Sequence, residues 1–260
     1  MEQFSGPTQA ESVRAKKETI LRRYDDWQLT LEEQEKLGKI TAEQRRRIIS
    51  RSMLARDLIG ARYKDQAFLD ALTGLPNNRA FIREYDRLVT SGESFGLICG
   101  DFDRFKTIND TYGHQAGDDV LFQAAQRIAV SLRIERAEQD VVTVTSEDEP
   151  EKNEEDLSEE ERRRRKVLRK GGEEINCLLP GIKNEEDLKR IAERIRAEFA
   201  ETPFTVGING KKVEIPLTIS LGAGVFVPGN DVKEDFYRDV DAALYKAKER
   251  RNAVQIISSK

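Results

Sequence analysis

Apolar residues recur at helical spacing along much of this chain, and elsewhere they form short runs of the kind found in buried strands. Before about residue 64 only the helical spacing occurs, over residues 12–27, 30–37 and 41–61. Thr30 and Thr41 each precede an acid or amide in the manner of helix N-terminal caps. We therefore predict a helical region over residues 1–64 that serves as a connector or dimerisation element.

After residue 64, helical and strand patterns alternate. They predict helices from about residue 78 and over residues 116–134, 185–199 and 235–250, and strands over residues 95–101, 166–170, 175–179, 204–208, 213–226 and 253–257. Asn209 and Gly210 form a turn signal, and Gly171 and Gly172 predict a tight hairpin. Residues 65–260 are thus expected to form one mixed domain of helices and strands.

Charged residues interrupt this alternation at about residues 143–165. The segment is acidic from Glu147 onward and then turns basic from Arg162 to Lys166. Such blocks bury too little apolar surface to offset the entropy of ordering. We predict a mobile loop inserted before the hairpin, with a regulatory lid or a partner site as the alternative.

Composition limits the classes of function. The 260 residues contain 44 basic and 48 acidic side chains, and a net charge of −4 gives no general reason to expect nucleic-acid binding. No apolar segment is long enough to cross a membrane, and the polar start lacks a signal-peptide pattern, so we expect a cytoplasmic protein. Cys99 and Cys177 lie in predicted strands, where small reduced core residues are a simpler explanation than a metal pair.

Polar residues gather where the first predicted strand ends at Asp101, in a run that continues to Asp118. Further along, Glu173 and Glu174 stand at the tip of the predicted hairpin. Carboxylates from neighbouring strands at one sheet edge are ligands of the type that Mg²⁺ requires. The Gly-Gly-Glu-Glu string alone is better explained by solvated turn acids, but the run that ends at Asp118 favours a split metal and nucleotide site.

With these motifs in order, the chain resembles a GGDEF domain, the catalytic domain of diguanylate cyclases. The resemblance extends from Asp70 to the end of the chain, interrupted by the charged insertion. It rests on residues 70–77, 101–118, 171–174, 218–222 and 243–248. It implies an α+β fold of the ferredoxin-like, polymerase-palm type, with a central, mostly antiparallel sheet.

The resemblance also implies the ligands of the metal. Asp101, Glu173 and the carbonyl group of Phe102 match the family's ligands for Mg²⁺ or Mn²⁺. Glu173 thereby acquires a catalytic role. Glu174 matches a position that helps to deprotonate the attacking 3′-hydroxyl or binds a second metal, although a plain turn acid is the alternative.

Other matching residues imply a GTP site. Asn109 and Asp118 match the guanine-reading pair, since an amide and a carboxylate suit the donors and acceptors of the guanine edge. The side chain of Lys106 and the backbone amides of Arg104 and Phe105 match the phosphate cradle, and Lys106 is also counted as catalytic.

The remaining assignments are less direct. Lys248 and Arg251 match basic residues that hold the terminal phosphates, but the usual glycine before Arg-Asn is missing, so the choice between Arg250 and Arg251 stays open. His114 lies at the family's Gly-His position, either beside the substrate or ordering the loop that carries Asp118.

The family's inhibitory product site is expected to be absent. The Arg-x-x-Asp positions before the glycine pair fall on residues 162–165, which contain no aspartate. Arg136 and Asp140 resemble a displaced remnant of this site.

The predicted function is that of a diguanylate cyclase, which condenses two GTP molecules into cyclic di-GMP and two pyrophosphates. One domain holds one GTP, so the resemblance implies a Mg²⁺-dependent homodimer. The main alternative is a catalytically silent GGDEF-like module that binds GTP or a partner protein. A cyclase that makes an adenine-containing dinucleotide is disfavoured by Asp118.

Overall fold

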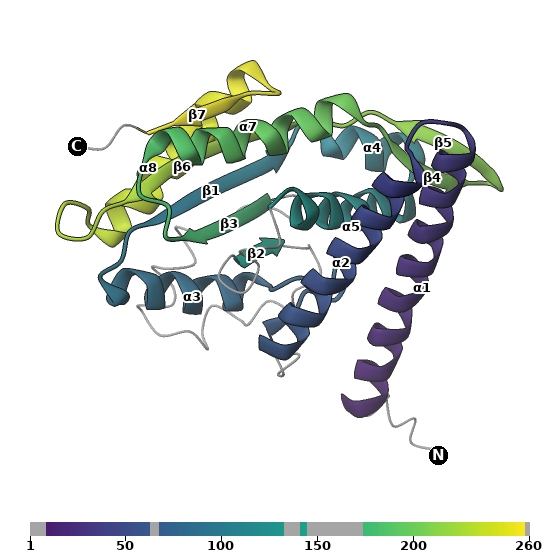
Figure 1. Cartoon of the computed structure of the whole chain (residues 1–260), viewed down its shortest axis with the longest axis horizontal. Coiled ribbons are helices and arrows are strands. Elements are labelled where there is room, and N and C mark those ends of the chain that lie inside the picture. Colours follow the sequence, from purple (N-terminus) through teal and green to yellow (C-terminus); the bar gives the residue numbers. More distant parts are fainter. Residues whose placement is uncertain (1–8, 63–67, 133–140, 145–173, 258–260) are drawn as a thin grey trace, which may run out of the picture.

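Figure 1 shows a computed structural model of the chain, which describes residues 9–62, 68–132, 141–144 and 174–257. Its centre is a five-stranded sheet in the order β2-β3-β1-β6-β7. The strands are β1 (Phe95–Phe102), β2 (Val141–Val144), β3 (Glu174–Pro180), β6 (Ile219–Phe226) and β7 (Val254–Ile256). Among these described strands, only β6 and β7 pair in parallel. This confirms the predicted α+β fold with a mostly antiparallel sheet.

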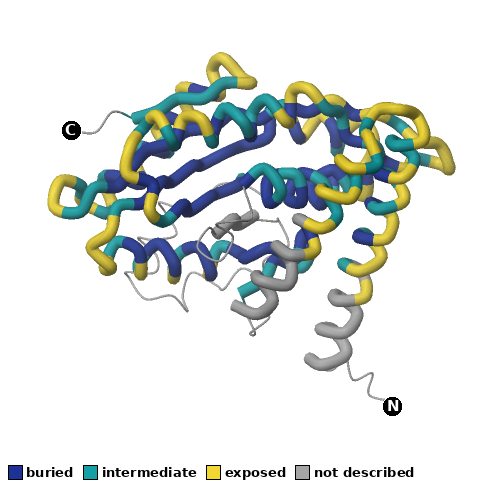
Figure 2. Tube along the Cα trace, viewed as in Figure 1, coloured by how far each residue is buried: buried dark blue, intermediate teal, exposed yellow. Residues whose placement is uncertain are grey.

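Helices cover both faces of the sheet, and β1 and β6 are buried along their whole length (Figure 2). One face carries α3 (Asn78–Ser91) and α8 (Lys233–Arg250), and the other carries α4 (Phe105–Tyr112), α5 (His114–Ser131) and α7 (Glu185–Glu201). Along β1, Phe95, Leu97 and Cys99 point to the first face, and Ile98 and Phe102 to the second, as the two-residue period of a strand requires. Asp101 therefore belongs to the face that α8 covers.

A separate two-stranded sheet consists of β4 (Phe204–Ile208) and β5 (Lys211–Ile215). Asn209 and Gly210 connect them with φ angles of 50° and 73°, which confirms the predicted hairpin turn. The prediction of a single strand over residues 213–226 is wrong, because these residues contribute to two strands, β5 and β6, which belong to different sheets. Pro216 lies between them and has no N–H group for a ladder hydrogen bond.

The N-terminal region consists of α1 (Gln9–Lys36) and α2 (Ala42–Arg62), which run side by side in Figure 1. The prediction of two helices before residue 40 is wrong: Thr30 does not cap a new helix, and its hydroxyl donates to the Asp26 carbonyl within α1. The second cap is confirmed. Thr41 and Gln44 exchange side-chain and backbone hydrogen bonds of 2.7 and 3.1 Å at the start of α2.

Two further predictions need correction. The helix expected over residues 116–134 begins at His114 and ends at Ser131, and it is preceded by the short helix α4, which the periodicity did not reveal. β3 pairs with β2, half of which falls within the predicted insertion. Residues 145–173 connect these strands. They include the predicted strand 166–170, the glycine pair and most of the insertion, and they lie outside the described residues.

Both cysteines are buried core thiols, as predicted. No helix in the described part of the chain is long and apolar enough to cross a bilayer.

Candidate functional site

The site begins at Asp101, near the end of β1. Asp101 is only 6% exposed, and in the sheet it pairs with Glu174 of β3 on one side and Ser220 of β6 on the other. Since Asp101 faces α8, the last turn of that helix can reach it. The Nζ atom of Lys248 lies 2.7 Å from Oδ2 of Asp101. The structure thus brings a predicted metal ligand into contact with a predicted phosphate-binding residue.

This strand end supplies two of the oxygen ligands predicted for a hard cation. Asp101 offers a carboxylate, and the Phe102 carbonyl belongs to the same strand end. Glu173 lies outside the described residues, and Glu174 is the first residue of β3 that the structure describes. Within the described ranges, no three His, Cys, Asp or Glu side chains gather in a way that could hold a metal ion. The predicted ligand set therefore stays a prediction.

Asp103 connects three segments of the chain at the edge of the site. Its carboxylate accepts hydrogen bonds from the hydroxyl groups of Thr218 and Ser220, at 2.6 and 2.7 Å, and from the backbone N–H of Asn252, at 2.8 Å. Its own N–H donates to the Thr218 carbonyl. The sequence analysis did not single out Asp103, and the Thr-Ile-Ser motif at residues 218–220 is the signal that could have indicated its role.

The contact with Asp103 explains how the turn after α8 forms although it contains no glycine. Arg251 and Asn252 have φ angles of 58° and 45°, in the left-handed region that most side chains avoid. The hydrogen bond from the Asn252 amide to Asp103 and a 2.8 Å bond from Arg196 to the Asn252 side chain stabilise this turn. Arg250 and Arg251 are both exposed, so each can reach a ligand from solvent.

The predicted phosphate cradle lies at the start of α4. Arg104 precedes the helix in a left-handed conformation with φ of 59°. Phe105 is buried in the core, and Lys106 is 85% exposed, 3.9 Å from Asp110. The first amides of α4 therefore sit at an exposed helix start, which is a suitable place for an anion.

The predicted guanine-reading residues lie close together because α4 and α5 approach at Gly117. A Cβ atom on Gly117 would lie 1.8 Å from Oδ1 of Asn109, so any larger residue would have to displace the Asn109 amide. This contact brings the Asn109 amide beside the residue that precedes Asp118. The Asp118 side chain is 43% exposed and so is accessible to a ligand. His114 is exposed at the first position of α5.

An arginine from the N-terminal helix joins this group. Nη2 of Arg23 lies 3.2 Å from Oδ2 of Asp118, and its Nε lies 3.7 Å from the carboxylate of Asp119. Burial raises the pKa of Asp119, and the Arg23 guanidinium opposes this rise. No motif in the sequence indicated Arg23, because it acts across 95 residues of chain.

The sequence profile described as "Diguanylate cyclase, GGDEF domain" matches residues 67–149 and 152–253. The chain belongs to the GGDEF family. This confirms the resemblance stated from its motifs. The residues of the displaced inhibitory site, Arg136, Asp140 and the stretch 162–165, lie outside the described residues, so the absence of that site in this GGDEF protein stays a prediction.

Individual relatives support the assignment to this family. The response regulator PleD of Caulobacter vibrioides is 34% identical over 72% of this chain and 36% of PleD. The diguanylate cyclase DosC of Escherichia coli is 31% identical over 78% of this chain and 38% of DosC. The chain thus spans less than half the length of these relatives. Among solved structures, the diguanylate cyclase SiaD of Pseudomonas aeruginosa, in complex with its activator SiaC, covers 96% of this chain and 87% of SiaD at 27% identity, with a TM-score of 0.58.

Proposed function

We propose that this GGDEF protein is a diguanylate cyclase that condenses two GTP molecules into cyclic di-GMP and two pyrophosphates. The observation that carries the proposal is the contact between Asp101 and Lys248, made within a chain that belongs to this family. A buried carboxylate and a cationic side chain, side by side at a strand end, form a suitable frame for a metal and a triphosphate.

Asp101, the Phe102 carbonyl and Glu173 would hold Mg²⁺ or Mn²⁺. The bound metal would neutralise negative charge on the phosphates during transfer. Lys248 would then release Asp101 and hold a terminal phosphate, together with Arg251 or Arg250. Glu174, which stands opposite Asp101 in the sheet, is the candidate group for accepting the proton of the attacking 3′-hydroxyl.

The GTP base and its phosphates would bind at α4 and α5. Asn109 and Asp118 read the guanine edge, because a carboxylate accepts from both N1–H and N2–H, which adenine does not offer in that arrangement. Lys106 and the amides of Arg104 and Phe105 hold the phosphates at the start of α4. His114 lies at the start of α5, close in sequence to Asp118, and would order the loop beside the base.

Two copies would be required for one catalytic event. Each domain holds one GTP, and each 3′-hydroxyl must attack the α-phosphate of the nucleotide held by the other domain. We assign residues 1–64 to a helical connector or dimerisation region and residues 65–260 to the catalytic domain. SiaD, which resembles this chain over 96% of its length and so also over its N-terminal helices, forms a complex with its activator SiaC, and this supports a regulatory role for that region. The cytoplasmic location stays a prediction.

A silent GTP-binding module is the second candidate. The observation that favours it is the same contact, because Lys248 already compensates the charge of the main metal ligand. The two functions differ in their products. Purified protein incubated with GTP and Mg²⁺ should yield cyclic di-GMP and pyrophosphate, identified by mass spectrometry. Binding of GTP without turnover, with a purified relative active under the same conditions, would favour the silent module. Incorporation of adenine from ATP would indicate a mixed cyclase.

A further inference from the structure

Helix α1 is anchored on α5 through an apolar cluster. Tyr24, Trp27 and Leu31 of α1 pack with Phe122 of α5, and all four residues are less than 9% exposed. The rings of Tyr24 and Phe122 meet edge to face, with centroids 5.1 Å apart. Ring pairs of this kind have a preferred geometry, so the cluster fixes which part of α1 lies against α5.

A buried polar network adds to this anchoring. The Tyr24 hydroxyl donates to Oε1 of Gln126 at 2.6 Å, and the Ser52 hydroxyl of α2 donates to the same oxygen at 2.7 Å. The Gln126 amide in turn donates to the Thr73 carbonyl. Buried polar groups are costly when they lose their partners. The network therefore holds α1, α2, α5 and the loop of residues 70–77 in one arrangement.

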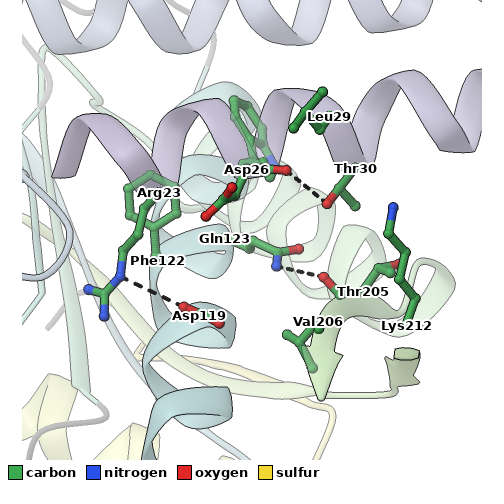
Figure 3. A pocket seen from close by; sticks show the side chains of 12 residues that line it. Arg23, Asp26, Leu29, Thr30, Asp119, Phe122, Gln123, Thr205, Val206 and Lys212 are labelled. Carbon is green, nitrogen blue, oxygen red and sulfur yellow. Dashed lines mark hydrogen bonds and ion pairs between the residues drawn. The ribbon is translucent and has the colours of Figure 1, made fainter. Parts of the chain in front are cut away.

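The guanidinium of Arg23, next to Tyr24, reaches from this anchored helix to the start of α5. Besides its contacts with Asp118 and Asp119, it donates to the Leu72 carbonyl at 3.4 Å. Figure 3 shows its side chain extending from α1 toward Asp119, at the edge of a cavity of about 350 Å³ between α1, α5 and β4. The Arg23 side chain is 14% exposed, so few other conformations are open to it.

The contact holds Asp118 without closing access to it. Arg23 donates to Oδ2 of the carboxylate, and the Asp118 side chain is still 43% exposed. A base can therefore still approach the carboxylate. The neighbouring charge of Asp119 would repel Asp118, and a cation between them offsets this repulsion. The arrangement favours one orientation of Asp118 before a nucleotide arrives.

We propose that Arg23 is a positioning residue for base recognition, which makes the affinity for guanine depend on the docking of α1 against α5. Arg23 acts through Asp118 and does not itself contact the nucleotide. The inference rests on the proposed function, in which Asp118 reads guanine. It deepens that function by giving the N-terminal helices a direct contact with the substrate site.

The test compares Arg23→Gln with Arg22→Gln in the full chain. Arg22 is the adjacent residue of α1 and is exposed, so it is a matched control. The probes are the α,β-methylene analogues of GTP and ATP, which cannot transfer the nucleotide. Arg23→Gln should weaken binding of the GTP analogue by about fivefold. Binding of the ATP analogue should not change, since the phosphate contacts remain. Arg22→Gln should match the wild type with both probes.

Asp118→Ala separates failure of the inference from failure of the proposed function. If Asp118→Ala keeps the wild-type ratio of GTP to ATP affinity, Asp118 does not read guanine and the proposed base site fails. If Asp118→Ala lowers that ratio but Arg23→Gln behaves as Arg22→Gln does, only the inference fails. Tighter guanine binding by Arg23→Gln would also overturn it, because Arg23 would then compete with the base. In a protein that carries both Asp118→Ala and Arg23→Gln, the Arg23 change should not lower the ratio of GTP to ATP affinity further.

A second substitution at Arg23 separates a loss of folding from a loss of positioning. Arg23→Lys keeps the charge and the aliphatic stem but loses the planar fork. It should restore part of the guanine preference, leaving a loss of about twofold, and its Tm should match that of Arg22→Gln. A loss as large as that of Arg23→Gln at an unchanged Tm would still support positioning by the fork. A full return of guanine preference in Arg23→Lys would reduce the effect to charge alone and overturn the positioning role.

Discussion

The ammonium nitrogen of Lys248 lies 2.7 Å from Oδ2 of Asp101, so a helix and a strand far apart in the sequence meet at the predicted metal site. The Asp101 side chain is 8% exposed and the Lys248 side chain 45%. A buried carboxylate needs a compensating cation, and here a side chain supplies it. A divalent metal bound at Asp101 would replace this compensation, which leaves Lys248 available for phosphate.

The first prediction concerns this exchange. Lys248→Gln removes the competing cation, so Mg²⁺ without nucleotide should raise the Tm of the variant more than that of the wild type. In the absence of Mg²⁺ the variant should lose about 1–2 kcal/mol of stability. Thermal melts with and without Mg²⁺ measure both effects. Lys246→Gln, at an exposed position of the same helix, is the control and should behave as the wild type does. Equal Mg²⁺ shifts in Lys248→Gln and the wild type would contradict the exchange.

The second prediction tests the assigned metal ligand Glu173. Glu173→Gln keeps the shape of the side chain and removes its charge, so cyclic di-GMP synthesis should fall by roughly a hundredfold or more, about 3 kcal/mol of transition-state stabilisation. The Tm should hardly change. Steady-state assays with purified protein measure the loss, and Glu186→Gln, at an exposed position of α7, should retain full activity. Synthesis at the wild-type rate by a folded Glu173→Gln protein would rule out the assignment.

The third prediction follows from the three hydrogen bonds that Asp103 accepts. Asp103→Ala leaves the Asn252 amide and two hydroxyl groups without this acceptor, and should cost about 3 kcal/mol of stability. Asp103→Asn retains a carbonyl oxygen for the Asn252 amide and can donate to a hydroxyl, so it should cost about 1 kcal/mol. Urea unfolding curves measure both values. Equal losses in the two variants would mean that charge, not hydrogen bonding, holds the turn.

The fourth prediction uses the tight contact between Gly117 and Asn109. Gly117→Ala places a methyl group where the Asn109 amide now lies, so the amide must turn away. The displaced atom is the end of a side chain, and alanine favours helix over glycine, so the Tm should change little. GTP affinity should fall by about tenfold, if Asn109 reads the base. Gly207→Ala is the control, because nothing lies within 4 Å of its added Cβ. Unchanged GTP affinity in Gly117→Ala would remove Asn109 from the base site.

Local signals predicted most of the fold. The helical spacing of apolar residues located α3, α7 and α8, and Asn209 with Gly210 located the β4–β5 hairpin because that turn needs positive φ angles. β2 was not predicted, because its four residues stand at the start of the charged insertion, which carries no strand pattern. Helix α4 was missed because two turns of helix give too short a pattern.

Long-range contacts within the site could not be predicted in the same way. Family motifs indicated Asp101, Lys248, Asn109 and Asp118 one by one, and the fold explains why they lie in pairs. Asp103 contacts Asn252 across 149 residues, and Arg23 contacts Asp118 across 95. Contacts of this kind depend on how the helices pack, which no spacing in a single segment encodes.

The last prediction concerns the homodimer. If both 3′-hydroxyls attack across an interface between two GTP-loaded domains, monomers are inactive, and mass action sets the active fraction. The specific activity should therefore rise with protein concentration and level off once the dimer predominates.

Mixing of wild-type and variant subunits provides a sharper test. A dimer of one wild-type and one Glu173→Gln subunit can form one phosphodiester bond but not the second. Excess Glu173→Gln should suppress cyclic di-GMP and leave a linear dinucleotide, whereas excess Glu186→Gln should not. Concentration-independent activity that Glu173→Gln fails to suppress would contradict a dimeric mechanism.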